Sequence, residues 1–501
     1  MIKKLISFIF VLLFVTNLSA SGLFEKTINV SNSETAMNDS QSSPDDYLNV
    51  DENISKLEWV YKFLLKNYVD ELDADALYKG AMEGMFSTLD DPYSEYFERT
   101  SQLGIELQET LTGSFGGIGV TITKPFKSTE EKPAYVEVMS AIDGTPGAKA
   151  GLRSGDYITE IDGTQTADIT MTEVLSILRG KVGTKVTIKV LRGKNINFEL
   201  TMTRAKIEVP TVKYQMLDNG IGYIKLLEFN PNSAKHIENA YNTLAKQNCK
   251  KLIFDLRDNP GGLLNAAMEV SSFFLERGDV VSTNGRMPNS VVNYKVDRFA
   301  QHLPADTPVV TLINSGSASA SEIVAGALKD NKRSVLVGVK TYGKGVVQMI
   351  YDLNDKEAFK FTSSRYYTPS GANINEIGIP ADYEVDFPEV LESEAEEFSR
   401  LYSEDKLDKF AKSKSNISTQ EIKEYAKKLQ ADYKIRLEIL EMAVRGRVNS
   451  YSSEFKVDTE FDPQLKKAIE ILQYKDANAL ARGAKTVAEL QDNLEKDKDT
   501  K

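Results

Sequence analysis

A serine-rich run lies where a predicted strand gives way to a predicted helix. The apolar residues 309–313 predict the strand, the run covers 314–321, and an alanine-rich pattern predicts a helix over 319–331. At such a junction backbone N–H groups lack helical partners and the helix dipole favours negative charge, which suits a nucleophile that becomes anionic. Ser319 is therefore a candidate nucleophile. A structural alternative stays open, because Ser319 and Glu322 also have the S-x-x-E spacing of a helix capping box.

A lysine between two glycines is the second candidate for chemistry. Lys344 follows the predicted strand 335–339. It is either an exposed turn residue or, in a closed site, a base whose pKa desolvation lowers from about 10.4. Gln348 is four positions further on, so on a strand both side chains share a face and the amide could orient the amine. Asp330 falls about three helical turns after Ser319. Alternatively, Asp330 only ends that helix.

Backbone donors for an oxyanion are predicted at a glycine-rich turn. The apolar run 252–256 predicts a strand, and the Pro-Gly-Gly sequence after it leads into a helix predicted over 262–276. The N–H of Gly261 or Gly262, together with that of Ala320, suits an oxyanion hole. The sequence does not choose between the two glycines, and an ordinary β–α turn is the alternative.

These segments together resemble one enzyme family. The chain reads GSASASE at 316–322 and TYGKGVVQ at 341–348, with Lys344 standing 25 positions after Ser319. This pattern is similar to that of the C-terminal processing peptidases, also called tail-specific proteases, which use a serine/lysine dyad. The segment FDLRDNPGG at 254–262 resembles the DLRxNxGG segment of the same family.

The resemblance assigns roles to individual residues. It implies that Ser319 is the nucleophile, that Lys344 is the general base and that Gln348 belongs to the same site. Asp330 matches an acidic residue of some members, whose role is less settled. The resemblance covers roughly 50–390 and departs at 391–455, where a charged helical stretch is inserted.

A β-rich module at 112–206 resembles a PDZ domain. Its segment FGGIGV is similar to the loop that binds a peptide's terminal carboxylate, and AGLRSGDYITEIDG is similar to the central PDZ segment. A peptide would pair there as an added strand, beside a helix predicted over 170–178. Arg179 meets either an anionic tail, an acidic residue in a moving interface, or only solvent. The predicted peptide-binding residues are Phe115, Gly116, Gly117, Ile118, Gly119, Val174, Leu178 and Arg179.

The elements around these motifs predict a multidomain α+β protein. Apolar residues recur at helical spacing before and after the site, short alternating runs fill the PDZ-like module, and strands alternate with helices in the protease core. The predicted divisions are a signal peptide at 1–20, a flexible linker at 21–46, a helical N-terminal region at 47–111, the PDZ-like domain at 112–206, the serine protease core at 207–390, and a helical C-terminal region with a charged tail at 391–501.

The amino-acid composition excludes several classes of function. Lys plus Arg number 61 and Asp plus Glu 73, a net charge of −12 that disfavours a large nucleic-acid footprint. One cysteine, Cys249, excludes an intramolecular disulfide and a cysteine-based zinc site. The two histidines, His236 and His302, show no metal-ligand spacing, so we expect no metal and no cofactor. A histidine-dependent hydrolase is a weaker alternative, because both histidines stand in segments that suggest structural roles.

We therefore expect an exported serine endopeptidase that recognises the C-terminal tails of protein substrates. Lys3 and Lys4, the apolar run 5–15 and the small residues before 21 predict export, to a bacterial periplasm. An uncleaved N-terminal anchor, with membrane association, is the alternative. Expected partners are proteins or peptides with accessible C-termini and, through the helical termini, a second copy of the chain; no nucleic acid is expected. The competing function is an exported PDZ-containing peptide-binding scaffold without catalysis.

Overall fold

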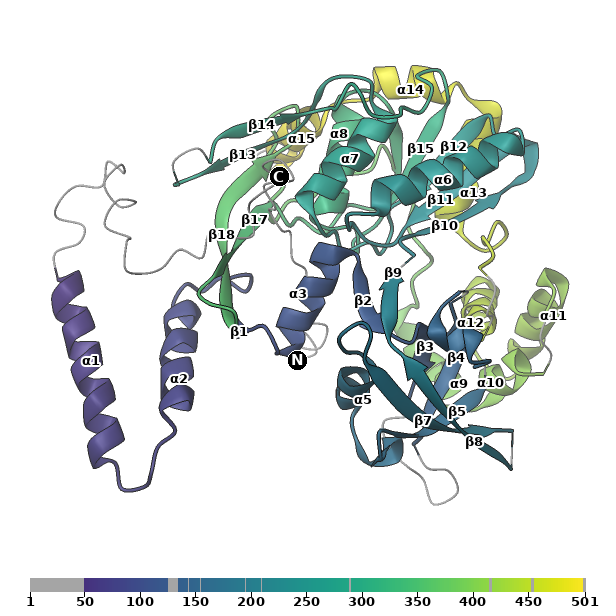
Figure 1. The fold of residues 1–501 in the computed structure, drawn as a ribbon. Coiled ribbons are helices and arrows are strands. Elements are labelled where there is room, and N and C mark those ends of the chain that lie inside the picture. The colour runs from purple at the N-terminus through teal and green to yellow at the C-terminus, as the bar shows by residue number, and fades with distance from the viewer. Residues whose placement is uncertain are drawn as a thin grey trace.

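The computed structural model describes residues 49–498, apart from 125–133, 143, 154, 194, 209, 288–289, 414–416 and 452–454. The predicted signal peptide and linker therefore lie outside the described residues. Figure 1 shows helices at both ends of the described chain, a β-rich module and a larger α/β body. The predicted fold class is confirmed. Within the described residues, no helix is long and apolar enough to cross a membrane.

A six-stranded sheet forms the centre of the α/β body. Every neighbouring pair from β11 to β19 is parallel, and only β10 is antiparallel. The inner strands are buried on both faces and read as continuous apolar runs, which is why their sequences predicted them. In sheet order the strands are β10 (Val212–Met216), β11 (Ile221–Leu226), β12 (Lys251–Asp255), β15 (Val309–Ile313), β16 (Val335–Gly338) and β19 (Tyr383–Glu384).

Helices cover both faces of this sheet. One face packs with α6 (Ser233–Lys246), α7 (Leu264–Phe274) and α8 (Ala320–Asp330) in the largest hydrophobic cluster described. The other face packs with α13 (Pro463–Tyr474) and α14 (Ala477–Gly483). Because the carboxyl ends of parallel strands share one edge, the segments that follow β12, β15 and β16 meet there. These segments are the glycine turn, the serine run and the lysine segment.

A second, antiparallel sheet closes over that edge, and its long hairpin was absent from the sequence prediction. The longest strand pairs with β17 along one side, while β1 and β13 share its other side. The segment predicted as wholly helical at 47–111 therefore also supplies a strand. The strands are β1 (Glu95–Glu98), β13 (Asp279–Gly285), β14 (Val292–Lys295), β17 (Val346–Asp352) and β18 (Glu357–Tyr367).

The β-rich module has its own sheet, its own helices and its own apolar core. The sheet order is β3-β4-β5-β7-β8, and β2 and β9 pair with each other as a two-stranded stem. The core is centred on buried valines and isoleucines of this sheet. The elements are β2 (Ser114–Gly117), β3 (Val120–Thr123), β4 (Val136–Ala141), α4 (Pro146–Lys149), β5 (Asp156–Ile161), β6 (Thr164–Gln165), α5 (Met171–Leu178), β7 (Lys185–Arg192), β8 (Ile196–Thr203) and β9 (Ala205–Glu208).

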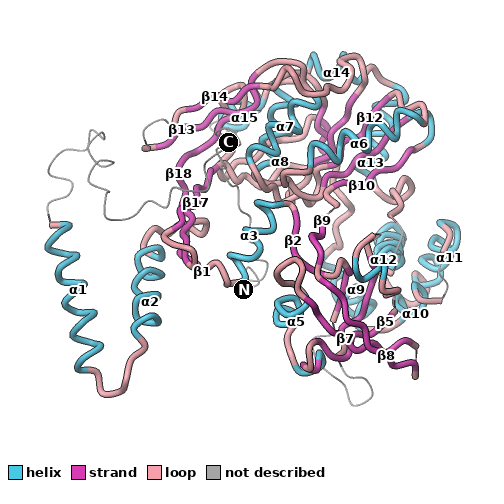
Figure 2. The backbone as a smooth tube through the Cα atoms, viewed as in Figure 1, coloured by secondary structure: helices cyan, strands magenta, loops and turns pink. Residues whose placement is uncertain are grey.

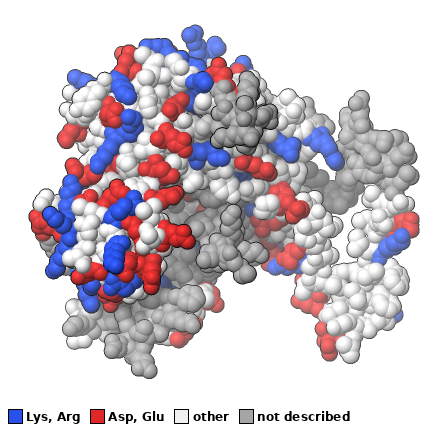
Figure 3. All heavy atoms as spheres, turned by 180° about the vertical axis from the view of Figure 1, so that it is seen from behind, with Lys and Arg blue, Asp and Glu red and all other residues white. Residues whose placement is uncertain are grey.

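Two N-terminal helices project from the body as an arm. Neither α1 (Val50–Asn67) nor α2 (Ala74–Ser87) contains a buried residue. Apolar side chains on the arm are exposed, including a stacked pair, Trp59 and Phe63, whose ring centroids are 5.1 Å apart. Figure 3, viewed from behind, shows this arm as mainly uncharged. The next helix, α3 (Gln102–Thr112), instead buries Leu103 and Leu107 in the main core.

The inserted stretch near 391–455 forms a helical module with a separate core. Its helices are α9 (Ala395–Ser403), α10 (Lys406–Ala411), α11 (Thr419–Leu429) and α12 (Leu437–Ser450), and Figure 2 shows them as one group. Tyr433 and Leu440 are fully buried among them. The module therefore stabilises itself rather than extending the central sheet's core.

The carboxylate of Asp330 joins the end of α8 to the C-terminal helix. Asp330 Oδ1 accepts the Val487 N–H at 2.8 Å, and Oδ2 accepts the Ser370 N–H at 2.9 Å. Val487 is the first residue of α15 (Val487–Lys498), and its side chain is buried in the main core. Asp330 therefore fastens α15 to the body.

We predict that Asp330→Ala destabilises the protein without removing catalytic chemistry. Two partly buried backbone donors would lose their acceptor, at about 1 kcal/mol or more each. The melting temperature should fall, while kcat/KM of the folded fraction, measured well below the melting temperature, should stay within about tenfold of wild type. Asp330→Asn, which keeps one acceptor oxygen, is the matched control. Complete inactivity at unchanged stability would instead make Asp330 a catalytic group.

Candidate active site

Ser319 lies between β15 and α8 in an unusual backbone conformation. Its φ is 58° and its ψ is −115°, a region that non-glycine residues rarely occupy and that is common at functional sites. The side chain is fully buried, and its Oγ has no hydrogen-bond partner among the described residues. A buried hydroxyl left unpaired costs free energy, so this position suits a reactive group better than a structural one.

The capping-box alternative for Ser319 is realised only in part. The Ser319 N–H donates to Glu322 Oε2 at 2.9 Å, as a capping box requires. The Glu322 N–H, however, donates to the Ser319 carbonyl oxygen at 2.8 Å rather than to the hydroxyl. The hydroxyl is thus available for chemistry while the carboxylate still caps the helix.

Asn259 connects the glycine turn to the serine run. Its side chain accepts the Gly261 N–H at 2.9 Å and donates to the Leu226 carbonyl at 3.0 Å. Its carbonyl accepts the Ala318 N–H at 3.1 Å and the Ser321 hydroxyl at 2.8 Å. This fully buried asparagine was not singled out by the sequence, although it is the asparagine of the DLRxNxGG segment.

The glycine turn approaches the nucleophile so closely that a side chain would not fit. A Cβ built on Gly261, whose φ is +106°, would lie 2.8 Å from Ser319 Cβ and 3.0 Å from the Ala320 nitrogen. The Gly261 N–H is already bonded to Asn259. Gly262 forms a parallel bridge with Phe229 through the neighbouring Gly261 carbonyl and Leu263 N–H, so its own N–H points away from Phe229. Gly262 and Ala320 are therefore the better oxyanion donors.

Lys344 is fully buried beside this junction. Its backbone N–H donates to Glu322 Oε2 at 2.9 Å, and its Nζ lies 4.3 Å from the ring centroid of Tyr93. Burial lowers the pKa of Lys344 to about 7, helped by the positive charge of Lys360 and opposed by Asp91 and Glu322. About half of the amines are then neutral near pH 7, as a general base requires.

Glu322 holds the two candidate catalytic segments together. Its Oε2 accepts the N–H of both Ser319 and Lys344, so these two nitrogens lie within about 6 Å of each other. Its Oε1 accepts the Thr341 hydroxyl at 2.6 Å and the Gly343 N–H at 2.8 Å. Burial raises the pKa of Glu322 from its ordinary value. The sequence indicated only its local capping spacing, because the partners at 341–344 are distant in the chain.

Two residues of the antiparallel sheet complete the surroundings. The Tyr366 hydroxyl donates to the Ser319 carbonyl at 3.1 Å and contacts the Lys344 carbonyl. Gln348 is fully buried on β17, and its Nε2 donates to Thr362 Oγ1 at 3.3 Å. Tyr366 was missed by the sequence because the strand that carries it, β18, was not predicted.

Asp330 is not brought to the candidate nucleophile. It ends α8, whereas Ser319 precedes the first residue of that helix, and eleven residues at about 1.5 Å of rise separate them by roughly 15 Å. Its two carboxylate oxygens accept backbone N–H groups. The sequence left open whether Asp330 belongs to the active site or only ends the helix. The structure places it at the end of α8, where it holds that helix end in position.

The predicted peptide-binding loop is only partly open. Phe115, Gly116 and Gly117 belong to β2 and pair with β9. Gly116 also accepts the Gly180 N–H at 2.9 Å, and a Cβ on Gly116 would overlap the Gly180 carbonyl. Ile118 is buried, and Gly119, with a φ of +72°, packs against Thr145.

The expectation that a peptide meets Val174 and Leu178 needs correction. Both side chains lie in the module core, with 0% and 4% of their surface exposed, so neither offers a contact surface in this conformation. Their positions on α5 turn inward because the helix packs on the sheet through them. A pocket of about 310 Å³ is lined instead by Leu175, Ser176 and Arg179, together with residues of β2 and α3.

Arg179 pairs with an acidic residue outside the module. Its Nη1 lies 2.6 Å from Glu109 Oε1 on α3, and its guanidinium lies 4.8 Å from the ring centroid of Phe115. The sequence left open whether Arg179 meets an anionic tail, an acidic residue at an interface, or only solvent. In this structure Arg179 forms the ion pair at an interface. Arg179 thus joins the β-rich module to the helical segment that leads into the body.

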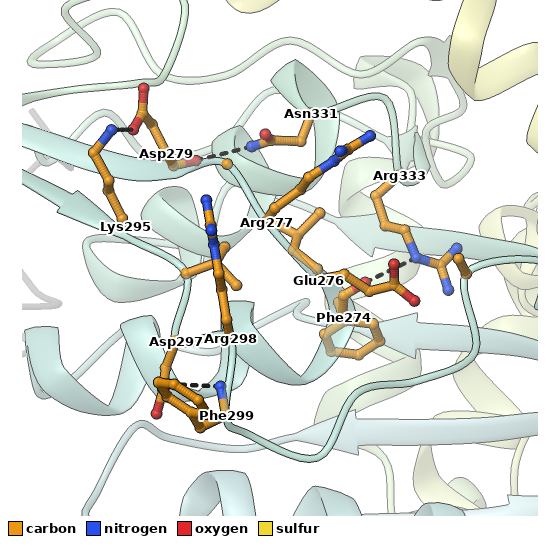
Figure 4. A pocket seen from close by; sticks show the side chains of 14 residues that line it. Phe274, Glu276, Arg277, Asp279, Lys295, Asp297, Arg298, Phe299, Asn331 and Arg333 are labelled. Carbon is orange, nitrogen blue, oxygen red and sulfur yellow. Dashed lines mark hydrogen bonds and ion pairs between the residues drawn. The ribbon is translucent and has the colours of Figure 1, made fainter.

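Another cavity, of about 830 Å³, lies away from these residues. It is lined by residues near the ends of α7, α8, β13 and β14, including Arg277, Arg298 and Arg333 as well as Glu276 and Asp297. Figure 4 shows charges of both signs around it. Neither Ser319 nor Lys344 lines it, so its size does not make it the active site.

The two histidines have structural partners. His236 Nδ1 lies 2.9 Å from Thr211 Oγ1, and burial lowers the pKa of His236. His302 Nδ1 lies 2.6 Å from the Ser272 carbonyl. His302 faces a carbonyl oxygen, His236 faces the hydroxyl of a fully buried threonine, and neither ring bonds the Ser319 hydroxyl, which weakens the histidine-dependent alternative.

Three family models match parts of this chain. The model of Peptidase family S41 matches residues 220–385, that of the activating protease CtpB N-terminal domain matches 16–101, and that of the PDZ domain matches 137–192. The chain is 36% identical to the carboxy-terminal-processing protease of Bartonella bacilliformis, over 66% of this chain and 74% of that protein. It is 33% identical to carboxy-terminal processing protease CtpA of Bacillus subtilis, over 68% of this chain and 70% of that protein.

A solved structure is also similar. It is a photosystem II D1 C-terminal processing protease, 31% identical, with a TM-score of 0.39 and coverage of 72% of this chain and 93% of that chain. The Peptidase family S41 match at 220–385 includes the serine run and the lysine segment, and the PDZ match at 137–192 lies within the β-rich module. The chain therefore belongs to the carboxy-terminal processing proteases of Peptidase family S41 and carries a PDZ domain.

Proposed function

We propose that this protease is an exported serine endopeptidase in which Ser319 is the nucleophile and Lys344 the general base. The observation that carries the proposal is the pairing of a buried, unbonded Ser319 hydroxyl with a buried amine whose pKa is about 7. One carboxylate, that of Glu322, fixes the backbones of both residues. An inert scaffold has no use for a strained serine and a desolvated lysine, which together cost stability.

The proposed reaction follows acyl-transfer chemistry. Ser319 Oγ attacks the scissile carbonyl while the neutral Lys344 amine takes its proton. The N–H groups of Ala320 and Gly262 donate hydrogen bonds to the oxyanion, and their placement at a helix start adds the favourable end of the helix dipole. Lys344 then returns the proton to the leaving amine, and a water molecule, deprotonated by the same lysine, releases the acyl group from Ser319.

We predict that Ser319→Ala reduces proteolysis to background and that Lys344→Ala lowers kcat by about 10²–10⁴-fold. Lys344→Arg should fail similarly, because a guanidinium stays protonated near pH 7. Cleavage of an unfolded protein substrate, with circular dichroism as the folding check, measures this. The double variant His236→Ala and His302→Ala is the control, and its folded form should remain proteolytically active. An active Lys344→Ala variant would refute the dyad.

We predict that the rate rises with pH along one ionisation with a midpoint of about 7. The neutral amine is the active form, so activity is lost as pH falls below the midpoint and reaches a plateau above it. Measuring kcat/KM from pH 5 to 10 on a substrate without titrating groups in that range tests this. A midpoint near 10 would mean that Lys344 is solvated in the working enzyme. Neither EDTA nor reducing agents should inhibit.

The PDZ domain is proposed to select substrates by their C-terminal tails. In support, the FGGIG segment retains glycines whose backbone approaches its neighbours closely, and a pocket opens between α5, β2 and α3. Arg179 lines this pocket and is already held by Glu109, so an incoming carboxylate would compete for a cation that links the domain to the body.

We predict that amidating a substrate's C-terminus weakens its binding by about 1.5–3 kcal/mol, the value of a lost charge-assisted hydrogen bond. Cleavage at a distant bond should slow correspondingly at substrate concentrations below KM. One unfolded substrate is compared with free, amidated and aspartate-ended tails. Equal rates for all three would refute tail selection while leaving the proposed dyad intact.

Export to a bacterial periplasm is proposed from the lysines and apolar run within residues 1–20. N-terminal sequencing of the protein recovered from a periplasmic fraction tests both export and cleavage. Recovery only from the cytoplasm would contradict it, and an intact N-terminus in the membrane fraction would support the anchor instead.

A second copy of the chain is proposed to cover the apolar arm formed by α1 and α2. Neither helix contains a buried residue. Without a partner, apolar side chains such as Trp59 and Phe63 would therefore face water. We predict a mass above that of the monomer by light scattering, with Trp59→Ser plus Phe63→Ser lowering it towards the monomer. Lys56→Ser on the same helix is the matched control. A monomeric wild-type protein would refute the proposal.

A further inference from the structure

A rigid turn from the N-terminal region reaches the proposed active site. Asp91 Oδ1 accepts the Tyr93 N–H at 3.0 Å, and its Oδ2 accepts the Ser94 hydroxyl at 2.6 Å. Ser94 Oγ in turn accepts the N–H of Thr362 on β18 at 2.9 Å. The turn is therefore fixed both internally and to the strand that faces Gln348 through Thr362.

The ring of Tyr93 lies at the boundary between the amine and the surface. Lys344 Nζ stands 4.3 Å from its centroid, and Lys344 is fully buried while Tyr93 is half-buried. A side-chain hydrogen bond joins Tyr93 to Tyr342, which is 53% exposed. The Lys344 amine is thus innermost, the Tyr93 ring lies outside it, and Tyr342 lies at the surface.

Other groups face the same amine from three elements. Lys360 on β18 is buried and pairs with Glu95 at 2.6 Å, and its charge disfavours the protonated amine. Asp91 of the turn and Glu322 of α8 favour the protonated amine. The Tyr366 hydroxyl of β18 contacts the lysine's own carbonyl oxygen. Of these groups, Asp91 belongs to the segment from Asp91 to Glu95, and Lys360 pairs with that segment through Glu95.

We propose that Tyr93 is a positioning residue for the general base, a role that rests on the proposed Ser319/Lys344 dyad: its ring excludes water from the Lys344 amine and fixes where that amine lies. The turn that carries the ring comes from outside the S41 match at 220–385. Tyr93 therefore makes the N-terminal region part of the catalytic machinery.

The ring has two opposite effects on the amine. Its face attracts the ammonium form, which favours protonation, while its bulk keeps water away, which disfavours protonation. Desolvation is the largest cause of the lowered pKa of Lys344, and the Tyr93 ring, 4.3 Å from Nζ, is one of the groups that bury the amine. We therefore expect water exclusion to outweigh the attraction, so that removing the ring makes the amine more basic.

The test compares Tyr93→Ala with Tyr93→Phe, which keeps the ring and loses only the hydroxyl. In Tyr93→Ala, the midpoint of the pH–kcat/KM profile should rise by about one unit or more, giving about fivefold lower activity at pH 7 that is regained above pH 9. Tyr93→Phe should keep the wild-type midpoint. The loss at pH 7 should appear in kcat, with KM within about twofold, because the ring contacts the base rather than a bound peptide. Tyr78→Ala on α2, whose ring contacts Tyr96 and not the lysine, is the matched control.

Each outcome decides the proposal. An unshifted midpoint in folded Tyr93→Ala, or a loss that is uniform at every pH, would overturn it and leave Tyr93 a packing residue. If Tyr93→Ala does not fold by circular dichroism, Tyr93→Leu replaces it and must show an upward shift. A second readout needs no activity: the ¹³Cε signal of Lys344, assigned with Lys344→Ala, should titrate at higher pH in Tyr93→Ala combined with Ser319→Ala. An active Lys344→Ala enzyme would instead refute the dyad itself.

Discussion

A buried carboxylate at the start of α8 accepts hydrogen bonds from two segments that are more than twenty residues apart in sequence. Glu322 receives the N–H of Ser319 on one side and those of Gly343 and Lys344 on the other, together with the Thr341 hydroxyl. Without it, four buried donors would be left unsatisfied, at about 1–3 kcal/mol each. The lysine segment has few other reasons to lie against the serine, so the geometry of the proposed dyad depends on this one side chain.

The strained conformation of Ser319 persists because its neighbours are held independently. Asn259 fixes the preceding Ala318 through its carbonyl, and Tyr366 donates to the Ser319 carbonyl from the opposite sheet. Gly261 packs so closely that the serine has no room to relax towards it. A left-handed non-glycine residue costs roughly 1–3 kcal/mol and survives only where the surroundings over-determine it. Here the Glu322 and Tyr366 side chains bond the serine's own backbone, while the Asn259 carbonyl and the backbone of Gly261 hold its two neighbours' positions.

The parts of the fold that depend on local pattern could be predicted from the sequence, and those that depend on distant pairing could not. The apolar runs at β11, β12, β15 and β16 predicted the central sheet, because strands that are buried on both faces need a continuous apolar sequence. The hairpin of β17 and β18 was missed because β17 shows no alternation of buried and exposed residues, and two buried positions of β18 hold the polar residues Lys360 and Ser364. The pairing of β1 with β18 joins residues about 260 positions apart, which no local signal records.

The same distinction holds at the site. Ser319, Lys344 and Gln348 stand in short motifs that the sequence shows directly, and the structure brings the first two to one carboxylate. Glu322 had an adequate local explanation as a capping residue, so its distant partners were not sought. Tyr93 was not singled out, because the sequence DDPY at 90–93 belongs to no motif of the predicted site. Val174 has the helical spacing of a groove residue, but the same spacing also serves a core, and burial decided between them.

The opposing charges around Lys344 have a chemical reason. A base in peptide hydrolysis must first take a proton from the serine and then give it to the leaving amine, so a pKa far from the working pH would impair one of the two steps. Burial and Lys360 lower the pKa, while Asp91 and Glu322 raise it, and the balance lies at about 7. Glu95 moderates Lys360 by pairing with it. Asp91 of the N-terminal turn therefore favours the protonated amine directly, and Glu95 of β1 favours it indirectly by pairing with Lys360. Both groups come from a region more than 200 residues before the serine, so the basicity of the proposed base depends on how that region packs.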